Sequence, residues 1–347
     1  MMQYYLGIDL GGTNTKIGLV DNEGNIVVKS SVPTYIQLGP EAACERIATG
    51  IHNMLTNTGI ERKDILSAGL ASAGTMDIPG RKLMVPANLG KKWNYCPICD
   101  MMSQASGFPV VFSNDASAAA FAEYWVGKGK NAKKNRLTKD GVEQTDEPIN
   151  SMILLTLGTG IGCGIILNKM VFDGEHSHGG EYGHSIINYS PDARICGCGK
   201  PGHFEAYASA TAVVARTKEL LASEGVETSL SHRVGDLDVL GAKVLDEEAQ
   251  KGDKVAIQLI RDTAQYLAVG ITTLMHTIDP DAIYIGGAMT FGGSGSETGD
   301  FFLNEVKAEV ARRAYKACST STILDFADLG GDAGFIGAAG IAKFSEK

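Results

Sequence analysis

The sequence predicts an α/β protein whose two related halves lie on either side of a deep cleft. Its 347 residues fit about two domains of ordinary size. A strand, a glycine-rich turn and a second strand occur at residues 4–20 and again at 153–167, each followed by helices. We therefore expect a smaller domain of residues 1–116, completed by a terminal helix at 333–347, and a larger domain of residues 117–332. Ligands usually bind between two such halves.

The first half begins with strands separated by turns that contain glycine. Apolar residues spaced four apart between 43 and 55, with a proline before them and Gly59 after them, predict a helix. The strands expected in this half are Tyr4–Ile8, Lys16–Val20, Asn25–Ser30, Ile65–Ala71 and Val110–Phe112, with an irregular stretch rich in proline and glycine before the last of them. An alanine-rich helix from about Asp115 follows.

A charged, polar run at residues 128–150 separates the two halves. We interpret it as a solvated loop or surface insertion, with a basic docking patch as the alternative. The second half then repeats the strand pattern at 153–157 and 163–167. Helices are expected at about 204–222, 251–278, 301–316 and from 333, with strands at 282–285 and 322–324.

Composition excludes several classes of protein. Lys and Arg number 31 and Asp and Glu number 40, so the net charge is −9, which argues against nucleic acid or an anionic membrane as a partner. No apolar run approaches the ~20 residues that span a bilayer. The start of the chain has no signal-peptide pattern, so we expect a cytoplasmic protein. The seven cysteines, an odd number, then suggest reduced thiols available for metal rather than disulfides.

Both glycine-rich turns could hold phosphate. Each turn can present backbone N–H groups to an anion. The first turn contains Gly11, Gly12 and Thr13, and the second, at residues 158–162, contains Gly158, Thr159 and Gly160. Asp9, at the end of the first strand, could hold Mg²⁺ through water. Either turn alone fits a plain tight turn, but the matching pair favours phosphate. Neither turn has the P-loop pattern, and neither leads into a helix as a dinucleotide fold requires.

Five short motifs occur in an order that resembles the ROK family of sugar kinases and repressors, over nearly the whole chain. They are Leu6–Thr13, Asn114-Asp115-Ala116 (preceded by Ala87-Asn88-Leu89), Gly180–His184, Cys196–Glu205 and Ile285–Ala288. The resemblance implies two ribonuclease-H-like domains of the actin-like ATPase type, with ATP as cofactor and a homodimer as the assembly. It also implies that Gly286 and Gly287 form the turn on the adenosine side.

The third and fourth motifs supply four candidate metal ligands. His184, Cys196, Cys198 and His203 offer the nitrogen and sulfur atoms that structural Zn²⁺ binds in a tetrahedron. The family pattern has cysteine where this chain has His203, so a metal-free loop with surface thiols is the alternative. The resemblance further implies that His184 binds zinc through one ring nitrogen and sugar through the other. A zinc with four protein ligands would be structural.

Asp115 is the candidate general base for phosphoryl transfer to an alcohol. From the residues alone, Ser113-Asn114-Asp115 fits a helix N-cap better than a catalytic group. The resemblance implies that Asp115 is the base, because the Asp of this pair is the base in the kinases. The same resemblance implies sugar contacts from Asn88, Asn114, Asp115, Glu181, His184 and Glu205.

Two classes of function follow. The first is an ATP- and Mg²⁺-dependent hexose kinase, most specifically a glucokinase, in which sugar closes the cleft and excludes water. Fructose, mannose, N-acetylglucosamine and N-acetylmannosamine are alternative substrates. The second is a sugar-sensing regulator without catalysis. Asp9, both glycine turns and Asp115 favour the enzyme, and the first strand begins too early for the DNA-binding domain of the family's repressors.

Overall fold

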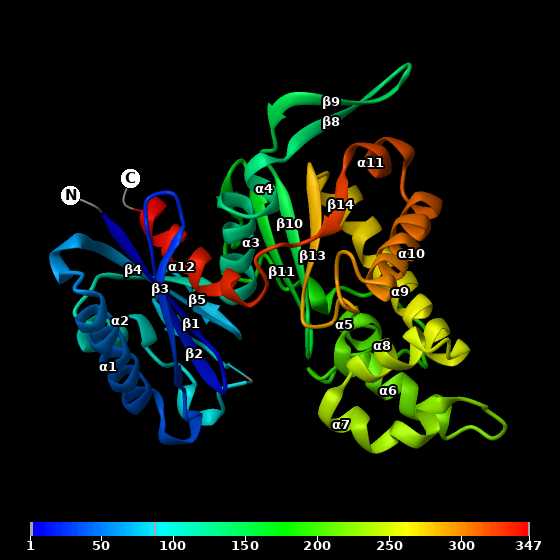
Figure 1. The fold of residues 1–347 in the computed structure, drawn as a ribbon, viewed down its shortest axis with the longest axis horizontal. Helices are drawn as coiled ribbons and strands as arrows, with labels where there is room; N and C mark the ends of the chain where they lie inside the picture. Colours follow the sequence, from blue (N-terminus) through cyan, green and yellow to red (C-terminus); the bar gives the residue numbers. More distant parts are fainter. Residues whose placement is uncertain (1–2, 87, 346–347) are drawn as a thin grey trace. The chain divides into compact units, whose positions relative to one another are not determined.

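Two mixed five-stranded sheets form the framework of the chain (Figure 1). The computed structural model describes residues 3–86 and 88–345. The first sheet has the order β3-β2-β1-β4-β7, in which β1, β2 and β3 are antiparallel neighbours and β4 and β7 continue parallel to β1. Its strands are β1 (Tyr4–Leu10), β2 (Asn14–Val20), β3 (Ile26–Pro33), β4 (Ile65–Ser72) and β7 (Val110–Asn114).

Helices pack on this sheet through apolar stripes. Helix α1 (Pro40–Thr58) buries Ile47, Ile51 and other residues of one helical face against the apolar side chains of β1 and β2. Helix α2 (Ile98–Ser106) joins the same core, within the stretch that the sequence predicted to be irregular. Helices α3 (Asp115–Trp125) and α12 (Ala333–Ser345) pack against each other, and α12 also contacts β1 and β4.

The second sheet repeats this topology. Its order is β12-β11-β10-β13-β14, which corresponds strand for strand to the first, with β10, β13 and β14 parallel. The strands are β10 (Met152–Leu157), β11 (Ile161–Leu167), β12 (Met170–Val171), β13 (Ala282–Gly287) and β14 (Ile323–Phe326). The duplicated pattern and the α/β fold class predicted from the sequence are thus confirmed.

Further helices belong mainly to the second half of the chain. They are α4 (Lys128–Asn131), α5 (Glu205–Ala208), α6 (Ala210–Leu221), α7 (Leu237–Leu240), α8 (Lys243–Gln250), α9 (Lys254–Ile278), α10 (Glu297–Arg313) and α11 (Lys316–Ser321). The helix predicted at 204–222 is divided because Ser209 adopts an extended backbone and caps α6. A small hairpin, β5 (Met76–Asp77) and β6 (Lys82–Leu83), lies in the first half. No described helix is both long and apolar enough to cross a membrane.

The chain divides into two compact units. The first contains the residues up to Asn131, Gly164–Gly180 and those from Asp328 onward, and the second contains Ala132–Cys163 and Glu181–Ala327. The predicted domain boundaries at 116 and 333 stay a prediction, because a grouping of contacts in the folded chain does not show which segments fold on their own.

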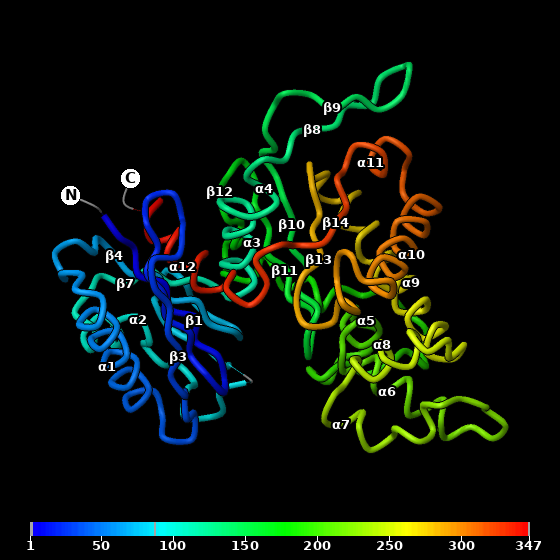
Figure 2. The backbone as a smooth tube through the Cα atoms, viewed as in Figure 1, coloured from blue at the N-terminus to red at the C-terminus, as the bar shows by residue number. Residues whose placement is uncertain are grey.

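The charged run after α4 forms a hairpin rather than an irregular loop. Strands β8 (Lys133–Thr138) and β9 (Gly141–Pro148) make a separate two-stranded sheet that extends as a narrow arm from the second unit (Figure 2). Opposite charges across the strands, such as Arg136 and Glu147 at 2.5 Å, favour this pairing. Most of the arm is exposed, in agreement with a surface insertion.

A glycine allows α12 to approach α3 closely. A Cβ atom placed on Gly337 would lie 1.6 Å from the carbonyl oxygen of Ala118, a distance that forces the two helices apart. We expect Gly337→Ala to lower the free energy of unfolding by about 1–3 kcal/mol, although alanine favours helix by itself. Gly235→Ala is the control, because no neighbour lies within 4 Å there. Urea denaturation would show equal midpoints for the two variants if this packing is unimportant.

Asp253 caps α9, the longest described helix. Its Oδ1 accepts the N–H groups of Val255 and Ala256 at 2.9 Å, and its Oδ2 accepts from Thr228 and Ser229. Burial alone would raise the pKa of this carboxyl, but these hydrogen bonds outweigh it and lower the pKa to about 2. The unfolded pKa is about 3.9, so the stabilisation is complete above about pH 4 and disappears as the pH falls toward 2.

We therefore expect Asp253→Ala to lower the free energy of unfolding by about 1–2 kcal/mol at pH 7. The difference from wild type should shrink between pH 4 and pH 2, where the wild-type carboxylate becomes protonated. Denaturant midpoints measured across this range test the prediction, and a difference independent of pH would contradict it.

Candidate active site and metal centre

The first glycine-rich turn joins β1 to β2. Thr34, the residue that follows β3, holds the turn through two hydrogen bonds. Thr34 donates from its hydroxyl to the carbonyl of Gly11 at 2.7 Å, and its N–H donates to the carbonyl of Thr13 at 2.9 Å. The backbone carbonyl of Asn88 lies near Gly12, where a Cβ would be 3.2 Å from it. The first unit thus brings the turn and the exposed residue Asn88 together.

Asp9 and Asp115 influence each other in the same unit. The pKa of Asp9 is raised to about 6, first by burial and then by the negative charge of Asp115, while Lys16 acts in the opposite direction. A carboxylate that is costly to ionise for these reasons is stabilised when a cation arrives. This electrostatic arrangement fits the prediction that Asp9 lies beside Mg²⁺.

The capping interpretation of residues 113–115 applies to Asn114. Its side chain accepts the N–H groups of Ala116 at 2.8 Å and Ser117 at 3.2 Å, and Asp115 is the first residue of α3. The Asn114 Oδ1 atom is therefore occupied, so only its NH₂ group is offered to a ligand. Asp115 is half-exposed at the start of the helix, as a general base requires.

In the second unit, Gly158, Thr159 and Gly160 join β10 to β11, and α6 supports them. The Thr211 hydroxyl donates to the carbonyl of Thr159 at 2.7 Å, and the N–H of Ala210 donates to that of Gly158 at 2.9 Å. Gly286 and Gly287 end β13 beside this turn. A Cβ on Gly287 would lie 2.3 Å from the Leu157 carbonyl oxygen, so the close approach of the strands requires glycine.

A cavity of about 630 Å³ opens next to these two turns. Its polar lining includes Thr159, Thr211, Asp238, Lys243 and Asp246. Its apolar lining includes Val214, Leu237, Val239, Leu240, Met289 and Phe291. This volume and mixture of groups suit a small organic ligand with an anionic end at the glycine turn.

Sequence reasoning missed several of these residues. Lys16, whose ammonium bonds to the carbonyl of Gly331, was predicted only as a strand residue, although its register position opposite Asp9 could have indicated it. Thr211, Lys243 and Asp246 carry no local signal, because tertiary packing of α6 and α8 brings them to the cavity.

The remaining predicted residues of the second unit surround one histidine. His184 Nε2 lies 3.8 Å from Glu181 Oε2, and His184 Nδ1 lies 3.8 Å from Glu205 Oε1. Glu205 also reaches the second glycine turn, where it accepts the N–H of Ile161 at 3.4 Å. Glu181, His184 and Glu205 therefore form one polar cluster.

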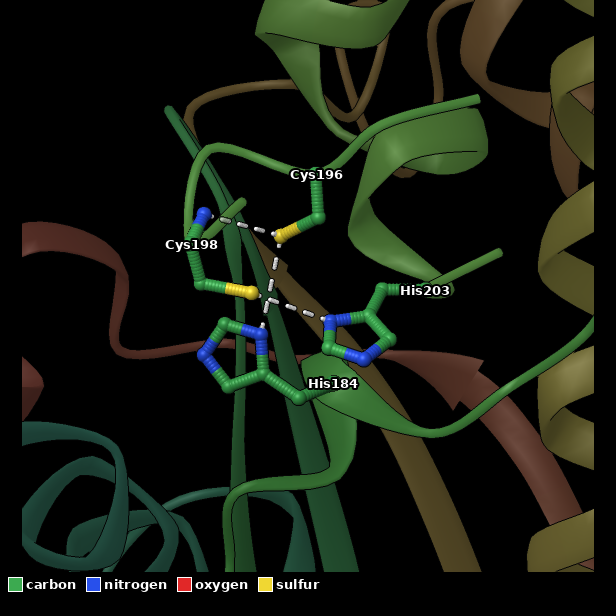
Figure 3. Close-up of side chains that lie close together, drawn as sticks. All are labelled: His184, Cys196, Cys198 and His203. Atoms are coloured by element: carbon green, nitrogen blue, oxygen red, sulfur yellow. Dashed lines mark hydrogen bonds between the residues drawn. The ribbon is translucent and has the colours of Figure 1, made fainter. Parts of the chain in front are cut away.

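The four predicted metal ligands point toward a common centre (Figure 3). Cys196 Sγ is 3.7 Å from His184 Nδ1, Cys198 Sγ is 3.2 Å from His203 Nδ1, and one ligand atom from each residue lies within 4.8 Å of the others. A tetrahedral zinc with bonds of 2.0–2.3 Å requires separations of about 3.3–3.8 Å between ligand atoms. The two separations of 3.7 and 3.2 Å are close to this range, and the ligand atoms that lie as much as 4.8 Å apart would draw together around the ion. Two thiols and two imidazoles are a donor set that fits zinc.

The protonation chemistry of the cluster is consistent with a metal ligand set. Burial raises the pKa of the Cys196 thiol to about 12, so a cation is needed to make it a thiolate. Burial, followed by the charge of His184, lowers the pKa of His203, which favours the neutral imidazole that binds metal.

Comparison with known proteins decides the family. The model of the ROK family matches residues 5–137 and 140–344. The chain is a member of the ROK family. This confirms the resemblance stated from the motifs, and the two mixed sheets agree with the two actin-like ATPase domains of ROK kinases.

Similar proteins have several activities. This ROK chain is 31% identical to a glucokinase of Halalkalibacterium halodurans, over 99% of this chain and 96% of the relative. A ROK family glucokinase from Streptomyces griseus, solved in complex with glucose and AMPPNP, is 28% identical with a TM-score of 0.74, covering 98% and 99% of the two chains. The chain is also 27% identical to an N-acetylmannosamine kinase of Escherichia coli, over 82% of each chain. A xylose repressor of Caldicellulosiruptor bescii is 25% identical over 90% of this chain and 71% of its own.

Proposed function

We propose that this ROK protein is an ATP-dependent hexose kinase, most specifically a glucokinase, that transfers the γ-phosphoryl group to the sugar 6-hydroxyl. The observation that carries the proposal is the pair of carboxylates Asp9 and Asp115, one at the glycine turn and one at the start of α3. A sensor that only binds sugar needs neither. The 31% identity to a glucokinase over almost the full length supports glucose as the acceptor.

Each group of residues has a role in this reaction. Asp115 accepts the proton of the attacking hydroxyl, and each glycine turn offers backbone N–H groups that can donate to phosphate oxygens. Mg²⁺ near Asp9 would supply positive charge to the phosphates when bound. The cavity lined by Thr211 and Lys243 would hold the nucleoside of ATP next to Gly286 and Gly287.

Hydroxyl recognition falls to the remaining polar residues. Glu181 and Glu205 accept hydrogen bonds from sugar hydroxyls, His184 presents Nε2, and Asn88 and Asn114 donate from their amides. Zinc held through His184 Nδ1 would fix the orientation of that ring. Because four protein atoms fill a tetrahedron, this zinc would be structural.

A coupled assay of ADP release with a panel of sugars tests the proposal. We expect the highest kcat/KM with glucose and lower values with fructose, mannose and the N-acetylated hexosamines. Preference for another hexose would correct the substrate, and sugar binding without ADP release from any of them would indicate a sensor. Sedimentation would test the expected homodimer.

A further inference from the structure

We infer that Glu123 is a positioning residue for the phosphate side of the site, which rests on the function proposed above. This carboxylate is fully buried near the end of α3 and accepts backbone N–H groups from the turn that follows α3 and from a segment 205 residues away. Oε1 accepts from Asp328 at 2.8 Å and from Leu329 at 2.7 Å. Oε2 accepts from Lys128 at 3.1 Å.

The two segments that Glu123 joins are the first exit from the first unit and the last return to it. The chain first passes into the second unit after Asn131, contributes residues 164–180 to the first unit, and comes back for the last time at Asp328. These three hydrogen bonds are costly to lose, because the Glu123 carboxylate would then be buried without the donors that satisfy it. Glu123 therefore fixes the start of the returning segment with respect to α3, the helix that begins with Asp115.

The returning segment borders Asp9 and Lys16. The carbonyl of Gly331 accepts from the Lys16 ammonium, and Asp332 pairs with Lys29 at 2.5 Å. A Cβ placed on Gly334 would lie 2.5 Å from an Asp9 carboxylate oxygen, so this backbone lies directly against the carboxylate. Gly334 lies six positions after Asp328, so only a short segment connects the anchor to the backbone beside Asp9.

The consequence is a mechanical link from Glu123 to the phosphate-binding groups. If the hydrogen bonds of Glu123 are lost, residues 328–334 become more mobile. Asp9 then loses its packing against the Gly334 backbone, and Lys16 loses the Gly331 carbonyl as a hydrogen-bond acceptor. Nucleotide binding and kcat should then weaken while sugar binding stays intact, since small misplacement of reacting groups is costly to rate.

Glu123→Gln tests this link. An amide offers one acceptor oxygen in place of two, so the donors of either Lys128 or Asp328 and Leu329 lose their partner. We expect the Kd for AMPPNP and the KM for ATP to rise about tenfold, with kcat lower and the glucose Kd changed less than about twofold. Amide hydrogen exchange of residues 328–334 should become faster.

Gly127→Ala is a second variant, because its Cβ would lie 2.1 Å from Glu123 Oε2 and displace the carboxylate.

Asp281→Asn is the matched control. Asp281 Oδ2 also accepts backbone N–H groups from a distant segment, those of Asn150 at 2.7 Å and Ser151 at 3.0 Å, but it lies before β13 in the second unit. Equal losses of Tm in E123Q and D281N with no change in nucleotide binding by either would overturn the inference. If the wild-type protein binds no AMPPNP, the proposed function fails. Amide hydrogen exchange of residues 328–334 then tests by itself whether Glu123 holds this segment: faster exchange in E123Q supports the inference, and unchanged exchange rejects it.

Discussion

Replacing Asp115 by Asn is expected to lower kcat by about 10²–10⁴ and to leave the sugar dissociation constant nearly unchanged. The amide keeps the size and hydrogen bonding of the carboxylate but cannot accept the proton of the sugar hydroxyl, so the loss falls on the transition state. Because Asn114 is the residue that caps α3, the substitution at Asp115 leaves the cap in place, and Tm should stay close to that of wild type.

Asp253→Asn provides the control for this experiment. It makes the same chemical change at the start of another helix, where the cap is structural, and its kcat should equal that of wild type. Measuring kcat, the sugar Kd and Tm for both variants separates catalysis from capping. Retention of more than about a tenth of wild-type kcat in D115N would show that Asp115 is not the base.

The duplicated topology could be predicted because local sequence patterns determine its strands and turns. Each sheet begins with a strand, a glycine turn and a strand, and β1 and β2 are buried along most of their length, as their nearly continuous apolar residues indicate. Helix α2 was missed since Cys96-Pro97-Ile98-Cys99 resembles a loop, while its helical character depends on packing of Ile98 and Met102 in the core.

The residues of the candidate site likewise include some that local sequence predicts and some that it does not. The glycine turns are short local motifs, and the metal ligands lie within twenty residues of one another, so spacing together with the family resemblance indicated them. Lys16, Thr211 and Glu123 act through contacts with Gly331, Thr159 and residues 328–329, which are 52 to 315 residues away in sequence. Nothing in the residues near each of these positions reports such a partner.

Cys198→Ser is expected to release zinc and to lower Tm by about 5–10 °C. Cys198 Sγ lies 3.2 Å from His203 Nδ1, and serine replaces a thiolate ligand by a hydroxyl that binds zinc poorly. A metal present at a thousandfold above its Kd stabilises the folded state by about 4 kcal/mol. Each kcal/mol corresponds to about 2–4 °C in a protein of 150–250 residues and to less in a longer chain.

The same variant should raise the sugar KM more than it lowers kcat. Without the metal, the His184 ring is no longer fixed beside Glu181 and Glu205, but Asp115 lies in the other unit and keeps its chemistry. Cys318→Ser, which changes a thiol outside the cluster, should keep one zinc per chain and wild-type Tm. His203→Cys, which restores the family's cysteine, should also keep the metal. Elemental analysis that finds no zinc in wild-type protein purified without chelators would remove the metal and leave His184 to be oriented by the two carboxylates alone.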